Sequence, residues 1–314
     1  MQEPNAILAI NSLDRYITNL GGNANQPFAN YIVSEYNNSE PYSNDFMIQS
    51  PGALIYGYIT RIIVSQIQIQ NNIPTVCNRR NDRFFITIDS TGDDYPITIP
   101  FGHYSPEELA STLDTLINAV PDLQPLEIEV TYVPRDGFRF ESKFPSQFYF
   151  PSIEDIRVIP GETEQSAIVA LKAYRLLGLT ITNSEPDVIQ VSNQTPNFLY
   201  TPYIDFYSDI LTNYQSVKDT NTSVAKPKGL IARVYLSGNG NVQNTTPARG
   251  LGTEPSVVTA DLNSPKVIRW TRDVAVPSID FQLRDCYGDF IPGPENNVST
   301  EWQMTLLCVE GADH

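Results

Sequence analysis

Cysteine, histidine and positive charge are scarce in this sequence. The 314 residues include three cysteines and two histidines, and 36 acidic residues outnumber 20 basic ones, which gives a formal charge of −16. Proteins that bind nucleic acids present clustered Lys and Arg side chains to the phosphates. The tightest basic pair here, Arg79–Arg80, is followed closely by Asp82. We therefore expect no nucleic-acid partner.

The cysteines and the apolar runs exclude further classes of protein. Cys77, Cys286 and Cys308 lack the paired spacing of a zinc site, so we expect buried thiols in a reducing compartment and no metal. No segment approaches the ~18–20 apolar residues of a membrane-spanning helix. The opening MQEPNAILAI has no basic region of the kind that begins a signal peptide. We expect neither a membrane span nor a signal peptide.

Motifs of catalysis are also missing. Of the two histidines, His103 is the one placed for chemistry, because His314 is the final residue; a structural role beside a helix start is the preferred interpretation of His103. Nucleophile-elbow, HExxH, P-loop, GxGxxG and EF-hand patterns are absent. The acidic turn at 89–94 fits an exposed hairpin tip better than a weak cation site. We expect no enzyme, no cofactor, and no catalytic or metal-binding residue.

What the sequence does contain indicates β-structure. Its 24 prolines interrupt helices and sheet ladders, while its 17 Tyr and 14 Phe suit pleated, half-buried surfaces. Ile67 and Ile69 alternate with three glutamines, which predicts a strand with one wet face. Further strands are expected at 84–89, 95–99, 126–133, 138–142, 187–191, 202–207, 229–236, 266–270, 278–283 and 302–309.

Two short helices are expected among these strands. Ser105 and Glu108 form a capping-box pattern around Pro106, and Pro121 ends the apolar period. A second helix is expected over about 164–177, closed by Gly178. The fold class is therefore mainly β, an antiparallel sandwich or barrel with two short helices packed on it.

The domain organisation follows from composition. Residues 1–50 are poor in periodicity, which predicts an extended N-terminal arm. Residues 51–314 are expected to form one domain, with a helix-containing elaboration at about 83–180 and a long polar loop at 237–261. Aromatic clusters at 148–150 and 198–207 are interpreted first as core, then as a protein interface, then as a carbohydrate-stacking surface.

A family resemblance appears when short motifs are taken in order. Residues 10–15 resemble the I-x-S-x-D-R opening of minor capsid or penton proteins of virophages, polinton-like viruses and giant DNA viruses. Residues 97–109, ITIPFGHYSPEEL, are similar to a second motif of that family. Matching segments also occur, in the family's order, at 45–48, 62–74, 176–179, 203–211 and 279–288.

The resemblance implies a single jelly roll that serves as a structural virion protein. Five copies would form each five-fold vertex of an icosahedral capsid, with the major capsid protein, and further minor capsid proteins, as partners. The protein would be located in the virion and, before assembly, in the host-cell cytoplasm or viral factory. Two alternatives stay open: a β-sandwich receptor- or carbohydrate-binding attachment module, and a β-sandwich glycosidase whose carboxylates come from distant strands.

Overall fold

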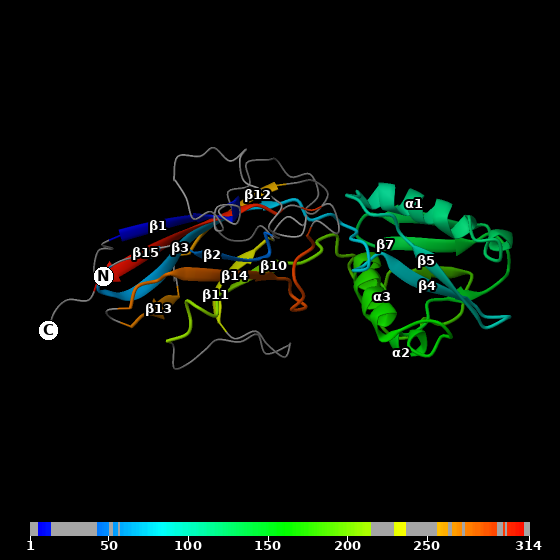
Figure 1. Cartoon of the computed structure of the whole chain (residues 1–314). Coiled ribbons are helices and arrows are strands. Elements are labelled where there is room, and N and C mark those ends of the chain that lie inside the picture. Colours follow the sequence, from blue (N-terminus) through cyan, green and yellow to red (C-terminus); the bar gives the residue numbers. More distant parts are fainter. Residues whose placement is uncertain are drawn as a thin grey trace, which may run out of the picture. The chain divides into compact units, whose positions relative to one another are not determined.

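The computed structural model describes residues 6–13, 43–49, 53–55, 57–214, 229–236, 256–262, 266–271, 274–293, 298 and 300–310. The chain divides into two compact units (Figure 1). Unit 1 comprises Met1–Asn72, Thr201–Pro247 and Pro255–His314. Unit 2 comprises Ile73–Tyr200 and Ala248–Glu254, so most of it is inserted between two parts of unit 1.

Unit 1 is built from two antiparallel sheets. Sheet A has the order β1-β15-β3-β12, and β13 also pairs with β3. Sheet B has the order β11-β10-β14-β2. The strands are β1 (Ala6–Asn11), β2 (Asp45–Gln49), β3 (Ile59–Asn71), β10 (Tyr203–Tyr207), β11 (Leu230–Tyr235), β12 (Ser256–Asp261), β13 (Val267–Arg269), β14 (Ser278–Arg284) and β15 (Trp302–Glu310).

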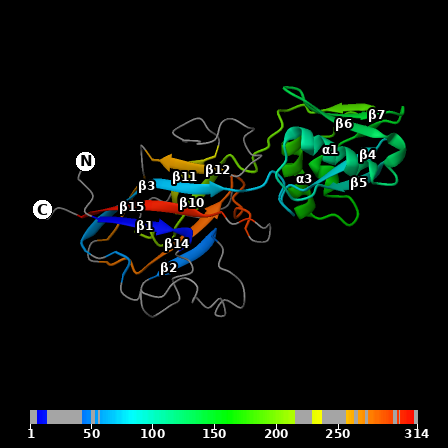
Figure 2. The ribbon, with the colours of Figure 1, turned by 90° about the horizontal axis from the view of Figure 1, so that it is seen from above.

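This strand order is that of a jelly roll. The chain alternates between the sheets through β1, β2 and β3, stays in sheet B for β10 and β11, and alternates again through β12, β14 and β15. Strands β12 and β13 share one position, because they pair with successive parts of β3. Figure 2 shows β1, β15, β3 and β12 side by side. The predicted antiparallel jelly-roll sandwich is confirmed.

Trp302 lies at the centre of the unit 1 core. It extends from β15 of sheet A, and its ring is 5.0 Å from Phe281, 5.3 Å from Phe206 and 5.7 Å from Phe46, which all belong to sheet B. Its indole nitrogen donates to the carbonyl of Ser43 at 3.0 Å, so the one polar atom of the ring is satisfied. The two sheets therefore pack face to face, and their other faces point away from this core.

The described part of unit 2 has two small antiparallel sheets and three helices. One sheet has the order β5-β4-β8 and the other β6-β7-β9. Its elements are β4 (Arg83–Ile88), β5 (Asp93–Thr98), α1 (Pro106–Asn118), a 3₁₀ turn (Gln124–Leu126), β6 (Ile128–Val133), β7 (Gly137–Ser142), β8 (Phe148–Tyr149), α2 (Ile153–Ile156), α3 (Glu164–Leu177) and β9 (Ile189–Val191).

Both predicted helices form; α3 has the predicted ends, and α1 begins at the predicted residue and ends at Asn118, shortly before Pro121. Ser105 caps α1 in a reciprocal capping box with Glu108. Gly178 ends α3 with φ of +70°, a left-handed conformation that suits glycine. Helix α1 contacts β6, and α3 contacts β4, so the helices pack on the sheets of unit 2 over a core of its own. The expected elaboration at about 83–180 thus lies within a second compact unit.

Two sequence-based boundaries are corrected by the structure. Residues 6–11 and 45–49, which belong to the predicted extended arm at 1–50, are strands β1 and β2 and pair with β15 and β14. Residues 256–261, at the end of the predicted loop at 237–261, form β12. In each case the partner strand lies far away in the sequence, so local composition does not reveal the pairing. Residues 14–42 and 237–255 lie outside the described residues.

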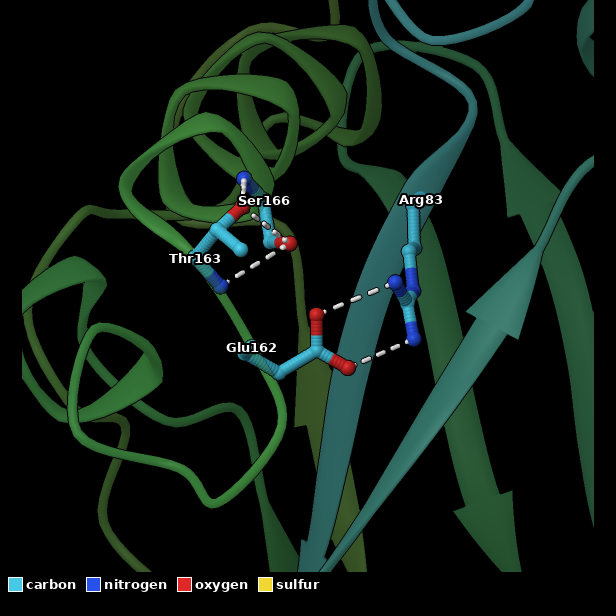
Figure 3. Close-up of polar contacts among 4 residues, drawn as sticks. All are labelled: Arg83, Glu162, Thr163 and Ser166. Atoms are coloured by element: carbon cyan, nitrogen blue, oxygen red, sulfur yellow. Dashed lines mark hydrogen bonds and ion pairs between the residues drawn. The ribbon is translucent and has the colours of Figure 1, made fainter.

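A bidentate ion pair joins the start of α3 to β4 (Figure 3). Arg83 donates through Nη1 and Nη2 to Glu162 at 3.0 and 2.6 Å, beside the N-cap Thr163 and its capping partner Ser166. The Glu162 side chain is 11% exposed, so the pair is shielded from water more than a surface pair is. It fixes the entry of the chain into α3.

Replacing Glu162 with Gln is expected to destabilise this corner of unit 2 by about 1.5 kcal/mol, because the guanidinium loses its charged acceptor. Hydrogen exchange of the first turn of α3 should accelerate accordingly. The matched control is Glu164→Gln, which removes a partner of Arg157 that is 63% exposed; this should change exchange by less than ~0.5 kcal/mol. Equal effects of the two substitutions would contradict the assignment.

Candidate assembly surface

The residues considered for chemistry in the sequence do not converge. His103 is exposed, as is most of the acidic turn at 89–94, where Asp94 accepts a hydrogen bond from Thr87 at 2.5 Å. The three cysteines are thiols, with Cys77 and Cys308 buried. Burial raises the pKa of the Cys308 thiol to about 11. Within the described ranges, no group of three His, Cys, Asp or Glu residues could hold a metal ion, and no helix there is long and apolar enough to cross a membrane.

Several motif residues of the resemblance form structural ties instead. Ser12 donates to Glu301 and accepts from the backbone nitrogen of Trp302, which fastens the end of β1 to the start of β15. Asp280 accepts from Ser208 Oγ at 2.8 Å and from the backbone nitrogens of Asp209 and Ile210. Two motifs distant in the sequence, 203–211 and 279–288, therefore meet in unit 1. Asp14 and Arg15 of the opening motif lie outside the described residues.

The outward face of sheet A carries three rows of side chains that cross its strands. The register places four residues in each row. The first row is Asn11, Gln303, Gln68 and Thr259, the second is Ala9, Thr305, Gln66 and Asp261, and the third is Ile7, Leu307, Ile63 and Val267. We call these three rows the sheet A face.

The three rows of the sheet A face are nearly free of charge, whereas the next row along the strands holds the paired residues Arg61 and Arg269. Asp261 is the one ionisable residue in the three rows, and its carboxylate accepts a hydrogen bond from Gln66 at 2.7 Å. The third row is apolar throughout, and its outer members Ile7 and Val267 are 68% and 46% exposed. Depletion of charge around exposed apolar side chains is typical of the centre of a protein–protein interface. On a chain of charge −16, this face is suited to close contact with another protein.

The outward face of sheet B is different in kind. Its central row is Arg284, Asp205 and Arg233, and beside it Tyr203 pairs with Tyr235 across β10 and β11. Tyrosine and arginine dominate the binding energy of many protein interfaces. We call these five residues the sheet B cluster. Because the two sheets pack through their inner faces, unit 1 presents two unlike surfaces on opposite sides.

Asp205 organises the sheet B cluster. It is fully buried and binds Arg233 through Nε–Oδ1 and Nη2–Oδ2 contacts of 2.6 and 2.8 Å. The hydrogen bond to Asp205 raises the pKa of Arg233 still further above its usual high value; burial acts against this rise, and the negative charge of Asp205 adds to it. The guanidinium also stacks 3.8 Å from the centre of the Tyr203 ring. Burial, and then the neighbouring Asp205, raise the pKa of Tyr207 to about 12, so this phenol stays protonated and donates to the carboxylate.

The predicted aromatic clusters take several of these roles. Phe148 and Phe150 lie in the core of unit 2, and Phe206 lies in the core of unit 1, as the first interpretation expected. Tyr203 instead supports the exposed cluster. The sequence predicted the solvent-exposed glutamine face of β3 but not the sheet A face. The rows of that face exist only once β1, β15, β12 and β13 are paired with one another or with β3.

The strand order of the two sheets defines the class of fold, a jelly-roll sandwich with a large insertion. No family model and no curated protein matches the chain. Among solved structures it is similar to the mavirus penton protein, with 9% identity, a TM-score of 0.46, and coverage of 84% of this chain and 93% of that chain. It is also similar to a chain of the Sputnik virophage, with 10% identity, a TM-score of 0.39, and coverage of 84% and 92%. Likenesses this weak assign neither a family nor a function.

Proposed function

We propose that this chain is a structural virion protein, a penton that forms the five-fold vertices of an icosahedral capsid. Five copies would close into a ring, and the ring would dock among capsomers of the major capsid protein. The role is one of assembly geometry and needs no catalysis. The observation that carries the proposal is the jelly roll of unit 1, with a nearly uncharged sheet A face on one side and the Tyr- and Arg-rich cluster of sheet B on the other.

A closed ring of five needs two different, complementary surfaces on each copy, because its contacts are head to tail. The two outward faces of unit 1 differ from each other, which supports contacts of this kind. Charge imposes a second requirement, since five copies at −16 carry −80 (5 × 16). Repulsion is screened over a Debye length of about 8 Å, so contacts closer than that must be neutral or paired. The three rows of the sheet A face hold one carboxylate, Asp261, and Asp205 in the sheet B cluster is already paired with Arg233.

The experiment that tests the proposal is mass measurement followed by imaging. Light scattering of the purified chain should give a species near 175.5 kDa, five times 35.1 kDa. Electron microscopy should show five-fold rings, and averaged images of virions should place their density at the vertices. A chain that stays monomeric at all concentrations and is absent from virions would rule the proposal out.

The expected positions of the acidic side chains can be tested in the same images. Carboxylates should lie mainly outside the subunit contacts, because contacts of a −16 chain cannot hold many unpaired acids. A pentamer whose contacts are dense in unpaired carboxylates would contradict the assignment of the faces, even if the ring itself forms.

A further inference from the structure

A concave site of about 600 Å³ lies on unit 2, between the β6–β7 turn and the segment that follows β9. Its charged lining residues are Arg135, Arg139 and Asp136, two guanidinium groups against one carboxylate. Glu141, which does not line the site, pairs with Arg139, so the charges of the two arginines are offset by Asp136 and Glu141. What the site offers an anion is therefore directed guanidinium donors, above all those of Arg135. A larger groove of the same unit, between α1 and β6, is acidic: its charged residues are Glu107, Asp114, Glu127, Glu129 and Lys143.

Arg135 is placed in this site at a cost in backbone energy. Its φ is +80°, a left-handed conformation that glycine or asparagine adopts more easily than arginine. Within the described residues, no hydrogen bond or ion pair engages its guanidinium. Arg139 binds Glu141 through Nε and Nη2, at 3.1 and 2.9 Å, and its side chain is 42% exposed. Both guanidinium groups therefore retain donors for a ligand.

The walls of the site are held rigidly. Ser192 accepts from the backbone nitrogen of Phe138 at 2.8 Å and donates to the carbonyl of Leu177 at 2.7 Å. Gly137 fits so closely that an added Cβ would lie 2.6 Å from the Cβ of Ser192. The backbone nitrogens of the next two residues, 193 and 194, both donate to the carbonyl of Gly178 at 3.0 Å. A site built on such fixed segments loses little conformational entropy when a ligand binds.

We propose that this site binds an acidic saccharide. Arg135 and Arg139 would hold its carboxylate or sulfate group, since guanidinium groups bind such anions with paired hydrogen bonds. The remaining lining includes Asn193, Gln194 and Thr195, whose amides and hydroxyl both donate and accept, as sugar hydroxyls do. Val133 and Val191, 38% and 51% exposed, offer apolar contact to a sugar ring. This site would place a carbohydrate-binding attachment function, the alternative raised from the sequence, on unit 2. The proposal of this site does not depend on ring formation.

The test uses the full-length chain and isothermal titration calorimetry. The probes are 3′-sialyllactose, a sulfated heparin disaccharide, neutral lactose and a glutamate-rich pentapeptide. We expect at least one acidic saccharide to bind tenfold or more tightly than lactose. Arg135→Asn, which tolerates positive φ, should weaken that binding at least tenfold. The control Arg157→Asn removes an exposed arginine of unit 2 that does not line the site, and it should leave affinity unchanged.

Four outcomes would overturn the proposal. They are no binding of either acidic saccharide, equal binding of lactose and the acidic saccharides, equal affinities of the Arg135→Asn chain and the unsubstituted chain, and binding of the acidic peptide alone. The last outcome would assign the site to a protein ligand instead. A circular dichroism spectrum unchanged by Arg135→Asn would show that any loss of affinity is not a loss of fold.

Discussion

Replacing Gln68 with lysine is expected to prevent ring formation while the monomer stays folded. Gln68 lies in the first row of the sheet A face, is exposed in the single chain, and pairs across the sheet with Gln303. A lysine there can remain in water in the monomer, but in the ring its charge would be buried without a partner. Such a buried charge costs about 3 kcal/mol per contact, which corresponds to a roughly 100-fold loss of affinity. Mass photometry should show monomers at concentrations where the unsubstituted chain gives the proposed pentamer.

The matched control for this substitution is Gln165→Lys. Gln165 is an exposed glutamine on helix α3 of unit 2, so the same change in charge falls outside the sheet A face. This variant should assemble like the unsubstituted chain. If both variants form rings, sheet A is not a subunit contact. If neither does, the added positive charge acts at long range and the position is irrelevant.

The second large effect is expected from Asp205→Asn. The substitution removes the carboxylate that lies between Arg284 and Arg233, and the two arginines are left on either side of a neutral residue on sheet B. Breaking a buried ion pair costs about 3–5 kcal/mol, and because the Arg233 side chain is 29% exposed we expect the lower end, about 3 kcal/mol. Hydrogen exchange in β10 and β11 should accelerate by roughly 100-fold.

Hydrogen exchange is preferred here because a chain with two compact units need not unfold in one step. The control is Glu141→Gln, which breaks the exposed pair with Arg139 on unit 2. That pair should contribute less than ~1 kcal/mol. A response of β10 and β11 to Asp205→Asn no larger than the local response to Glu141→Gln would show that the sheet B cluster is not held by its carboxylate.

The parts of the fold that sequence predicted well are those with local causes. Ser105 and Glu108 fix the start of α1 through contacts three residues apart, and Gly178 fixes the end of α3 through its own backbone conformation. Strand β3 was evident because isoleucines and glutamines alternate along it. The edge position of β5 also agrees with its Pro96, which cannot donate to a ladder.

The parts that sequence missed depend on distant partners. Strand β1 is short and its apolar residues are followed by a loop-like composition, yet it is fixed by β15 at the other end of the chain. Strand β12 follows a polar segment and is fixed by β3. The sheet A face was beyond prediction for the same reason: Ile7, Ile63, Val267 and Leu307 become one apolar row only through the register of four strands. The concave site on unit 2 likewise needs the turn at 134–137 to meet the segment after β9.

The position of β15 between β1 and β3 has a consequence for biosynthesis. The contiguous stretch Ile73–Tyr200 of unit 2 emerges from the ribosome as a whole and can begin folding early, whereas sheet A lacks its middle until the last sandwich strand has been translated. A prematurely terminated product would therefore contain a folded insertion but no complete sheet A face. If the proposed function holds, such fragments would be kept out of growing particles without any separate proofreading factor.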